Sequence, residues 1–228
     1  MKHKTYFVSD LHFGHANVID FDKRPWPDLE SMTQALIANW NATVTNADTV
    51  YILGDLFWTH ESAHEVLPQL KGRKILIRGN HDEGMTEQPE IAAQFEEIHD
   101  YLELEHAGLT LILSHYPIVP YLKCYKRNTL MLYGHVHNTQ DEWITRIGQK
   151  LSIESFELKA EDLNSNRGGL DVSRHPNTFA MINVGVMMPY MDWRPQPIHN
   201  LLDAAHQLKE ETKAASLDEL IAEMRAHI

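Results

Sequence analysis

Five short, nearly continuous apolar runs constrain the fold of this chain more than any other feature. Strands that face water on one side alternate apolar and polar residues, whereas strands covered on both faces are apolar throughout. Helical patterns lie between several of the runs, so the sequence predicts a layered α/β fold with buried sheets. The runs span residues 5–9, 49–53, 74–78, 109–114 and 129–133.

Two helical patterns lie between the first three runs. Ser31 and Gln34 form a capping-box pattern, which predicts a helix that begins at Ser31. The apolar face of this helix would hold Met32, Leu36 and Trp40. A second helix is predicted by apolar residues that recur at helical spacing at positions 63, 66, 67 and 70.

The last third of the chain has a different pattern. We expect antiparallel strands near 143–147, 151–158 and 178–184, with a polar, glycine-bearing loop at 164–169. Residues 200–228 read as helical, and Ser216 with Glu219 forms a second capping box.

Each of the five apolar runs ends in polar residues of an unusual kind. Ligands in layered α/β folds gather outside the carboxyl ends of strands, so we expect these side chains to lie together. Burying them without a partner would be costly. Carboxylates and imidazoles are ligands of first-row metals, and a pair of divalent cations would satisfy most of the set. In chain order the set is Asp10, His12, Asp55, Asn80, His81, Asp82, His115, His135 and His137.

These residues stand in five motifs that resemble those of the calcineurin-like metallophosphoesterases. The family pattern is DxH, GD, GNH[DE], a lone His and GHxH, and all five occur here in order within residues 8–137. The resemblance implies a four-layer α-β-β-α sandwich of two packed mixed sheets flanked by helices. It also implies one domain over residues 1–228, with C-terminal helices at about 200–228 packed on it.

The resemblance further implies a dinuclear metal centre and the residues that form it. Asp55 would bridge two divalent ions, for which Mn²⁺ is the first expectation and Fe, Zn²⁺, Ni²⁺ or Co²⁺ are alternatives. One ion would be held by Asp10, His12 and His137, and the other by Asn80, His115 and His135.

The implied reaction is hydrolysis of a phosphoester bond by attack of a metal-bound hydroxide. His81 would bind the phosphate and act as general acid, with Asp82 as the carboxylate that orients or charges it. Asn80 would contact the substrate as well as a metal. The motifs leave open whether the substrate is a monoester, a diester or a cyclic nucleotide. A non-catalytic metal-binding scaffold of the same fold is the alternative from a different class.

Three further residues could bear on substrate choice. Arg24 could grip a substrate phosphate, since guanidinium matches phosphate geometry, or it could be a surface arginine before a turn. His15 follows the first motif closely and either contacts the substrate or is a plain loop residue. Trp58 follows the GD motif where many relatives carry a smaller or acidic residue.

A competing motif runs from His60 to His64. His60-Glu61-Ser62-Ala63-His64 fits the H-E-x-x-H pattern of zinc metalloproteases. On a helix whose apolar face includes Ala63, both Glu61 and His64 would point toward solvent. We therefore interpret this motif as a surface coincidence in the first turn of a helix capped by Thr59.

Charge and composition limit the partners. Acidic residues outnumber basic ones by 32 to 20, giving a formal charge of −12, which disfavours extended nucleic acid and anionic membranes. A small phosphorylated substrate is the expected partner. The single cysteine, Cys124, and the lack of a signal-like or membrane-spanning apolar stretch favour a cytoplasmic location. The oligomeric state is left open.

Overall fold

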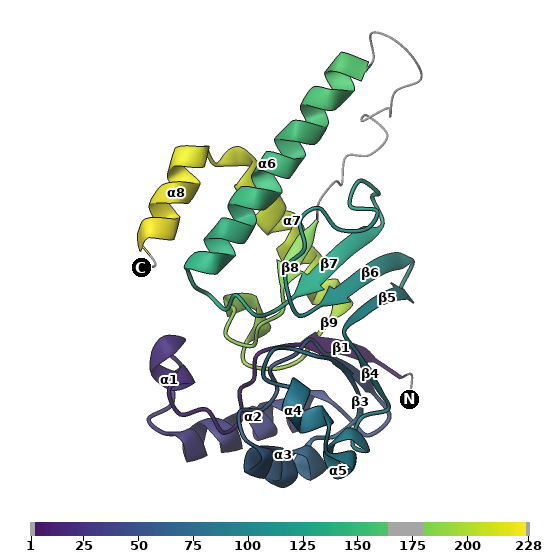
Figure 1. Cartoon of the computed structure of the whole chain (residues 1–228), viewed down its shortest axis with the longest axis vertical. Helices are drawn as coiled ribbons and strands as arrows, with labels where there is room; N and C mark the ends of the chain where they lie inside the picture. Colours follow the sequence, from purple (N-terminus) through teal and green to yellow (C-terminus); the bar gives the residue numbers. More distant parts are fainter. Residues whose placement is uncertain (1–2, 164–179, 227–228) are drawn as a thin grey trace.

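The computed structural model describes residues 3–163 and 180–226, which form two mixed β-sheets flanked by helices (Figure 1). This arrangement confirms the predicted sandwich. The first sheet has the order β4 (Glu97–His99), β3 (Arg73–Ile77), β2 (Thr49–Ile52), β1 (Thr5–Val8) and β9 (Gln196–Pro197). The second has the order β5 (Tyr101–His106), β6 (Leu109–Ser114), β7 (Thr129–Tyr133) and β8 (Met181–Asn183).

Most neighbouring strands run parallel, which requires crossover connections. Strands β1 to β4 are parallel to one another, as are β6 to β8, while β9 and β5 are antiparallel to their neighbours. Parallel pairs cannot be joined by tight hairpins, and helices fill the connections between β1 and β4. These are α1 (Val18–Phe21), α2 (Leu29–Thr43), α3 (His60–Val66), the 3₁₀ turn η1 (Leu67–Gln69), α4 (Glu83–Thr86) and α5 (Pro89–Ala92).

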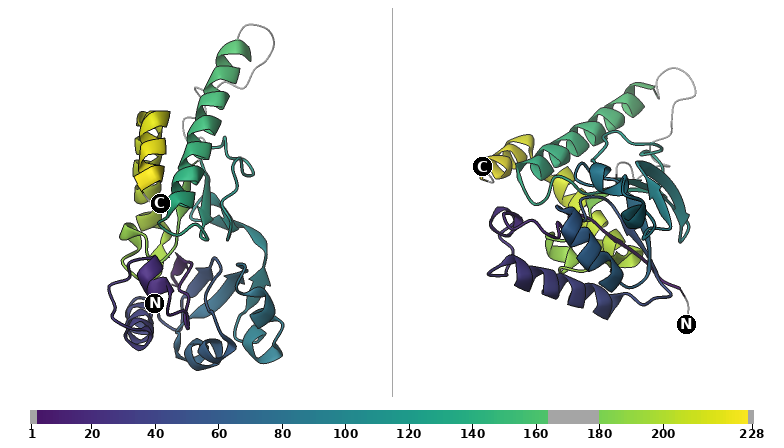
Figure 2. Two further views of the ribbon diagram at one scale, coloured as in Figure 1. Left: turned by 60° about the vertical axis from the view of Figure 1, so that its left-hand side comes forward. Right: turned by 60° about the horizontal axis from the view of Figure 1, so that its bottom comes forward.

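The remaining helices belong to the second half of the chain: α6 (Gln140–Leu163), the 3₁₀ turn η3 (Pro189–Met191), α7 (Ile198–Ala214) and α8 (Leu217–Ala226). Helix α7 contacts β1, β8 and β9, so it packs where the two sheets adjoin. Helix α6 projects well beyond the sheets, and α8 lies beside it (Figure 2). Among the described residues, no helix is both long and apolar enough to cross a membrane.

Strands β6 and β7 of the second sheet are buried on both faces, as their continuous apolar runs predict. In β6, Leu111 and Leu113 face the main core between the sheets, while Ile112 belongs to a second cluster on the other face. That second cluster includes Ile153 of α6 and Tyr121 of the loop after β6. The period-two alternation therefore sends apolar side chains into two different cores.

All five predicted apolar runs are strands, with bounds that differ by at most one residue. The sequence reading missed β4, β5 and β9. Strand β5 alternates exposed and half-buried residues at the edge of the second sheet, so it lacks a continuous apolar run. Strand β9 has only two residues.

The expected strands near 143–147 and 151–158 are wrong, because both stretches lie in helix α6. Its inward positions recur at helical spacing but are mostly polar, so hydrophobicity does not reveal the period. These buried positions are Glu142, Thr145, Gln149, Lys150 and Ile153.

Two further expectations concern the strand near 178–184 and the loop at 164–169. The strand expected near 178–184 exists as β8, but it pairs parallel with β7 rather than antiparallel. The expected loop at 164–169 lies outside the described residues.

The first predicted helix is present but begins earlier than expected. Asp28, not Ser31, is the N-cap of α2, and its Oδ1 accepts a hydrogen bond from the Ser31 amide at 2.7 Å. The second predicted capping box is confirmed at α8, where the Ser216 amide donates to Glu219 Oε2 at 2.7 Å. The Glu219 amide donates in return to Ser216 Oγ at 3.2 Å.

Trp40 anchors the predicted apolar face of α2 in the core. Its side chain is fully buried, and its indole Nε1 donates to the Lys71 carbonyl at 2.9 Å. We expect Trp40→Ala to lower the free energy of unfolding by about 3–5 kcal/mol, because it leaves a cavity and an unpaired carbonyl. Urea unfolding followed by circular dichroism measures this. The control Ile144→Ala, at a half-exposed position on α6, should change stability by about 0.5 kcal/mol or less. A loss below about 1 kcal/mol for Trp40→Ala would contradict the expectation.

Candidate metal centre

The carboxyl ends of five strands bring the motif side chains together. These strands are β1, β2 and β3 of the first sheet and β6 and β7 of the second. Two groups of metal-ligating side chains form there, and within each group the candidate ligand atoms lie within 4.8 Å of one another. One group is Asp10, His12 and His137, and the other is Asp55, His115 and His135.

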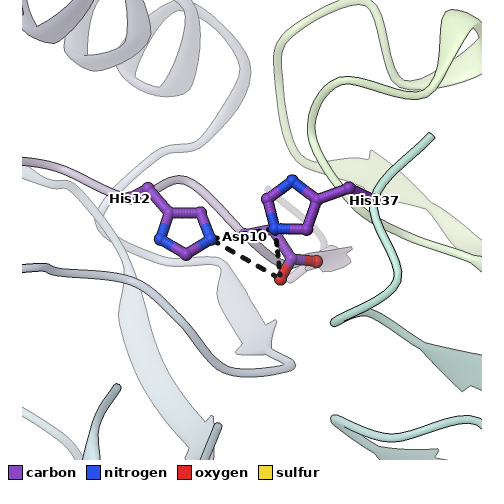
Figure 3. Close-up of side chains that lie close together, drawn as sticks. All are labelled: Asp10, His12 and His137. Atoms are coloured by element: carbon purple, nitrogen blue, oxygen red, sulfur yellow. Dashed lines mark hydrogen bonds and ion pairs between the residues drawn. The ribbon is translucent and has the colours of Figure 1, made fainter. Parts of the chain in front are cut away.

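In the first group the two imidazole rings turn toward the same carboxylate (Figure 3). The Nε2 atoms of His12 and His137 are 3.1 Å apart. Asp10 Oδ1 lies 4.0 Å from His12 Nε2 and 3.8 Å from His137 Nε2. Three donor atoms from two different sheets therefore converge on one small volume.

Asp55 links the first group to the second. Its Oδ2 lies 3.5 Å from His115 Nε2 in its own group and 3.8 Å from His12 Nε2 in the other. Asn80 Oδ1 approaches His115 Nε2 at 3.2 Å, which adds an amide oxygen beside the second group. A carboxylate in this position can reach both sides of a paired site.

The backbone at the site is held in an unusual conformation. Five of the grouped residues have φ angles between 50° and 72°, in the left-handed region that non-glycine residues rarely adopt. Such conformations cost on the order of 1–3 kcal/mol each and persist where the surrounding structure enforces them, commonly at functional sites. The five are Asp10, His12, Asp55, His135 and His137.

Two motif glycines permit this crowding. A Cβ atom on Gly79 would meet the Asp55 carboxylate, and one on Gly134 would meet the Ser9 hydroxyl and the Asp10 carboxylate. The glycines of the GNH and GHxH motifs are therefore needed for close approach of the backbone to the grouped carboxylates.

The pKa shifts of His12, His135 and Asp55 suit a divalent metal. Burial lowers the pKa of His12 well below its usual value, and the neighbouring His137 lowers it further. Burial and the neighbouring His115 likewise lower the pKa of His135. Neutral imidazoles offer a free lone pair. Burial raises the pKa of Asp55, and the nearby Asp10 adds to the rise, so an added cation would relieve an unfavourable pair of buried carboxylates.

Asp22 is a site residue that the sequence reading missed. Its Oδ1 pairs with His137 Nδ1 at 2.7 Å, on the side of the ring away from the first group. Burial opposes protonation of His137, but its hydrogen bond to Asp22 and the charges of Asp10 and Asp22 raise the pKa of this histidine. A carboxylate on the far nitrogen of a ligating histidine fixes its tautomer and ring orientation. No motif or spacing in the sequence marks Asp22.

Arg24 supports Asp22 and does not face solvent. Its guanidinium is fully buried and pairs with Asp22 Oδ2 at 2.7 Å. The remaining donors reach the Leu11 carbonyl at 2.8 Å and the Asp10 carbonyl at 2.9 Å. This corrects the expectation that Arg24 grips a substrate phosphate, because its N–H groups are directed to the protein's own oxygens. The alternative of a surface arginine before a turn is also wrong, because the side chain is buried.

Asn183 braces the GHxH turn from the second sheet. Its Nδ2 donates to the His137 carbonyl at 2.9 Å and to Glu142 Oε2 at 3.2 Å, and its Oδ1 accepts from the Gly185 amide. Glu142 also accepts a hydrogen bond from the Tyr133 hydroxyl. A buried polar network thus joins the site to helix α6.

Asp82 does not make the expected contact with His81. Its carboxylate instead accepts backbone N–H groups of Asp55, Gly79 and Leu56, at 2.7, 2.8 and 3.2 Å. Burial raises its pKa to about 6, although these hydrogen bonds favour the charged form. The side chain ties the turn after β2 to the turn after β3, which corrects the expected role of orienting the His81 ring.

His81 and His15 both lie beside Trp58. The His81 side chain is 34% exposed, its Nε2 is 3.8 Å from Asp55 Oδ2, and its amide donates to Asp55 Oδ1 at 3.0 Å. The ring centroids of His81 and Trp58 are 4.4 Å apart. His15 stacks face to face on Trp58, with centroids 3.8 Å apart and planes 7° from parallel.

The H-E-x-x-H residues lie on the surface, as predicted. Thr59 caps α3 through a capping box with Ser62, and the side chains of His60, Glu61 and His64 are exposed. His60 Nδ1 pairs with Gln88 Nε2 at 2.6 Å, and His64 Nε2 lies 4.0 Å from Glu90. Neither histidine belongs to the two metal-ligating groups found in residues 3–163 and 180–226.

Two mixed sheets flanked by helices are the metallophosphoesterase fold, and two candidate metal-ligand groups lie at their strand ends. Residues 3–186 match the calcineurin-like phosphoesterase family, and the chain belongs to this family.

Relatives from three sources resemble this chain. An uncharacterized protein of Methanocaldococcus jannaschii is 36% identical over 61% of this chain and 73% of its own length. The Gene 66 protein of Mycobacterium phage D29 is 32% identical over 59% of this chain and 78% of its own length. The crystal structure of a protein of unknown function from Aquifex aeolicus matches with a TM-score of 0.57 and 26% identity, over 89% of this chain and all of that one.

The Asp22–His137 pair generates a prediction about metal affinity. We expect Asp22→Asn to weaken divalent metal binding by about 10- to 100-fold, because an amide cannot hold the imidazole as a carboxylate does. Isothermal titration of metal-free protein with Mn²⁺ measures this. The control Asp20→Asn changes an exposed carboxylate on α1 and should leave affinity unaltered. Equal affinities for Asp22→Asn and wild type, with both proteins folded, would show that Asp22 does not contribute to metal binding.

Proposed function

We propose that this chain is a dinuclear metal-dependent hydrolase of phosphoester bonds. The family supports hydrolysis of phosphoesters in general. The observation that carries the finer proposal is the position of Asp55, whose Oδ2 lies within 4 Å of imidazole nitrogens from both ligand groups. A small phosphorylated substrate and a cytoplasmic location complete the proposal, in keeping with the formal charge of −12 and the single cysteine, whose thiol is buried.

The residues that would hold the metals follow from the two groups. Asp10, His12 and His137 would hold one ion, and His115, His135 and Asn80 the other, with Asp55 shared between them. Mn²⁺ is the proposed metal, with Fe, Zn²⁺, Ni²⁺ or Co²⁺ as alternatives, since mixed oxygen and imidazole donors accept each of these ions. Two such ions would polarise the phosphoryl oxygens and lower the pKa of a water molecule at the site.

His81 is the proposed general acid. It stands outside both ligand groups, yet its Nε2 lies 3.8 Å from Asp55 Oδ2 and its ring is partly open to solvent. In this position it can donate a hydrogen bond to the phosphate and pass a proton to the departing oxygen. Asp82 would act on this step only by holding the turn that carries Asn80 and His81.

Loss of the His81 imidazole should separate catalysis from metal binding. We expect His81→Ala to lower kcat on bis-4-nitrophenyl phosphate by about 10²- to 10⁴-fold while both ions remain bound. Asp55→Asn should lower the metal content itself, because it weakens the shared ligand. Steady-state kinetics with Mn²⁺ and elemental analysis of the purified variants give the two readouts.

Two results would count against the proposal. Full activity of His81→Ala would exclude its role as acid. Metal-loaded wild type that hydrolyses neither bis-4-nitrophenyl phosphate nor 4-nitrophenyl phosphate would favour the non-catalytic scaffold.

His64 tests the metalloprotease alternative and serves as a matched histidine control. It is exposed on α3 and is one of the two histidines that an H-E-x-x-H zinc site requires. We expect His64→Ala to keep the metal content and phosphoesterase activity of wild type. If His64→Ala removed a bound metal, the surface interpretation of this motif would be wrong.

A further inference from the structure

The imidazole of His81, the proposed general acid, forms no hydrogen bond within residues 3–163 and 180–226. Its Nε2 lies 3.8 Å from Asp55 Oδ2, which is beyond hydrogen-bond distance, and the Asp82 carboxylate binds backbone amides instead. A ring without such a partner can rotate about its side-chain torsions unless packing prevents it. Because a general acid must point at the departing oxygen, another group has to fix this ring.

The indole of Trp58 is packed directly on the His81 ring. The two ring centroids are 4.4 Å apart, and the planes are tilted by 48°. His12 also contacts the His81 ring, edge-on and with centroids 5.7 Å apart. A surface cavity of about 350 Å³ borders both Trp58 and His81. Without the indole, the imidazole would therefore have room to turn away from Asp55.

Trp58 is itself held through both its backbone and its side chain. Its amide donates to the Phe13 carbonyl at 2.8 Å, and Phe13 pairs with Phe57 in an isolated β-bridge. The ring of His15 stacks on the indole, with centroids 3.8 Å apart and planes 7° from parallel. Such an aromatic pair adds stability beyond the area that it buries, so the indole is fixed although Trp58 is 41% exposed.

The loop that carries His15 is closely packed. The His15 amide donates to the His12 carbonyl at 3.1 Å. Gly14 has a φ of 89°, and a Cβ atom there would lie 2.6 Å from Ser62 Oγ. That hydroxyl donates to the Phe13 carbonyl at 2.8 Å and so ties the loop to helix α3. His15 therefore stands on a rigid backbone and can fix the indole.

We propose that Trp58 is the positioning residue for His81 and that His15 acts with it by fixing the indole. This inference rests on the phosphoesterase function proposed above, in which His81 donates a proton to the departing oxygen. The packed rings would hold the imidazole beside Asp55 before a phosphate binds, so the alignment of the acid costs no further side-chain ordering. The orienting role that the sequence predicted for Asp82 thus belongs to Trp58.

The first test measures turnover of bis-4-nitrophenyl phosphate by metal-loaded variants. We expect Trp58→Ala to lower kcat by about 10- to 100-fold at the metal content of wild type, because the acid is present but misaligned. Trp58→Phe should restore most of the activity, since it keeps an aromatic face. His15→Ala should lower kcat by about 2- to 10-fold, the loss expected for one aromatic pair. The control Glu61→Gln changes another residue that lines the same cavity and should match wild type.

Two comparisons show whether Trp58 acts through His81. In the His81→Ala background, Trp58→Ala should lower kcat by less than about 2-fold, because the group that it positions is gone. Diphenyl phosphate has a poorer leaving group than bis-4-nitrophenyl phosphate, so the acid contributes more to its hydrolysis and Trp58→Ala should cause a larger loss. A merely structural residue would cause the same loss in both backgrounds and on both esters.

A third measurement does not depend on turnover. Carbon-13 relaxation of the His81 ring, assigned from the spectrum of His81→Ala, reports the amplitude of fast ring motion in the full chain loaded with Zn²⁺. The ring should move more in Trp58→Ala than in wild type, and Trp58→Phe should resemble wild type. Trp58→Leu, which keeps an apolar side chain of intermediate size, provides the same comparison if Trp58→Ala does not fold.

The outcomes separate this inference from the function on which it rests. Equal losses in the two backgrounds, unchanged ring motion in Trp58→Ala, or loss of metal from that variant would each overturn the positioning role while phosphoesterase activity stands. If wild type hydrolysed neither ester, the proposed function would be wrong, and the relaxation measurement would still decide whether Trp58 fixes the His81 ring.

Discussion

The turn that carries Asp55 is the point on which the rest of the site depends. Its carbonyl accepts the His12 amide at 3.0 Å, and its amide donates to Asp82 at 2.7 Å. Its carboxylate accepts the His81 amide. One residue therefore joins the turns after β1, β2 and β3, and its remaining oxygen faces imidazoles from both ligand groups. A left-handed backbone at such a position persists because hydrogen bonds from several directions enforce it.

Hydrogen bonds close to the site also join the two sheets. Ser9, directly after β1, exchanges backbone hydrogen bonds with Val184 and Val186 after β8, and the His135 amide donates to the Asp10 carboxylate. The sheets are thus connected by backbone at the very place where their ligand groups meet. Positions of donor atoms are set by this framework rather than by flexible side chains, which is what a metal site with defined geometry requires.

The elements that could be predicted from the sequence were those with a local hydrophobic pattern. Strands β1, β2, β3, β6 and β7 have continuous apolar runs, and the residues at their ends could be grouped because parallel strands end at one sheet edge. Helix α6 was missed because most of the residues on its buried side are polar. Strand β5 was missed because it lies at a sheet edge and therefore lacks a continuous apolar run. Asp22 could not be found, since its importance comes from a contact with His137, 115 residues away.

The formal charge of −12 counts Asp10 and Asp55 as uncompensated, yet both are buried between imidazoles in a site suited to divalent cations. Two bound divalent ions would bring about four positive charges against these two carboxylates, so the local field would favour a phosphate although the whole molecule is acidic. This field is local to the strand ends that carry the two ligand groups, so it does not conflict with the acidic charge of the whole chain.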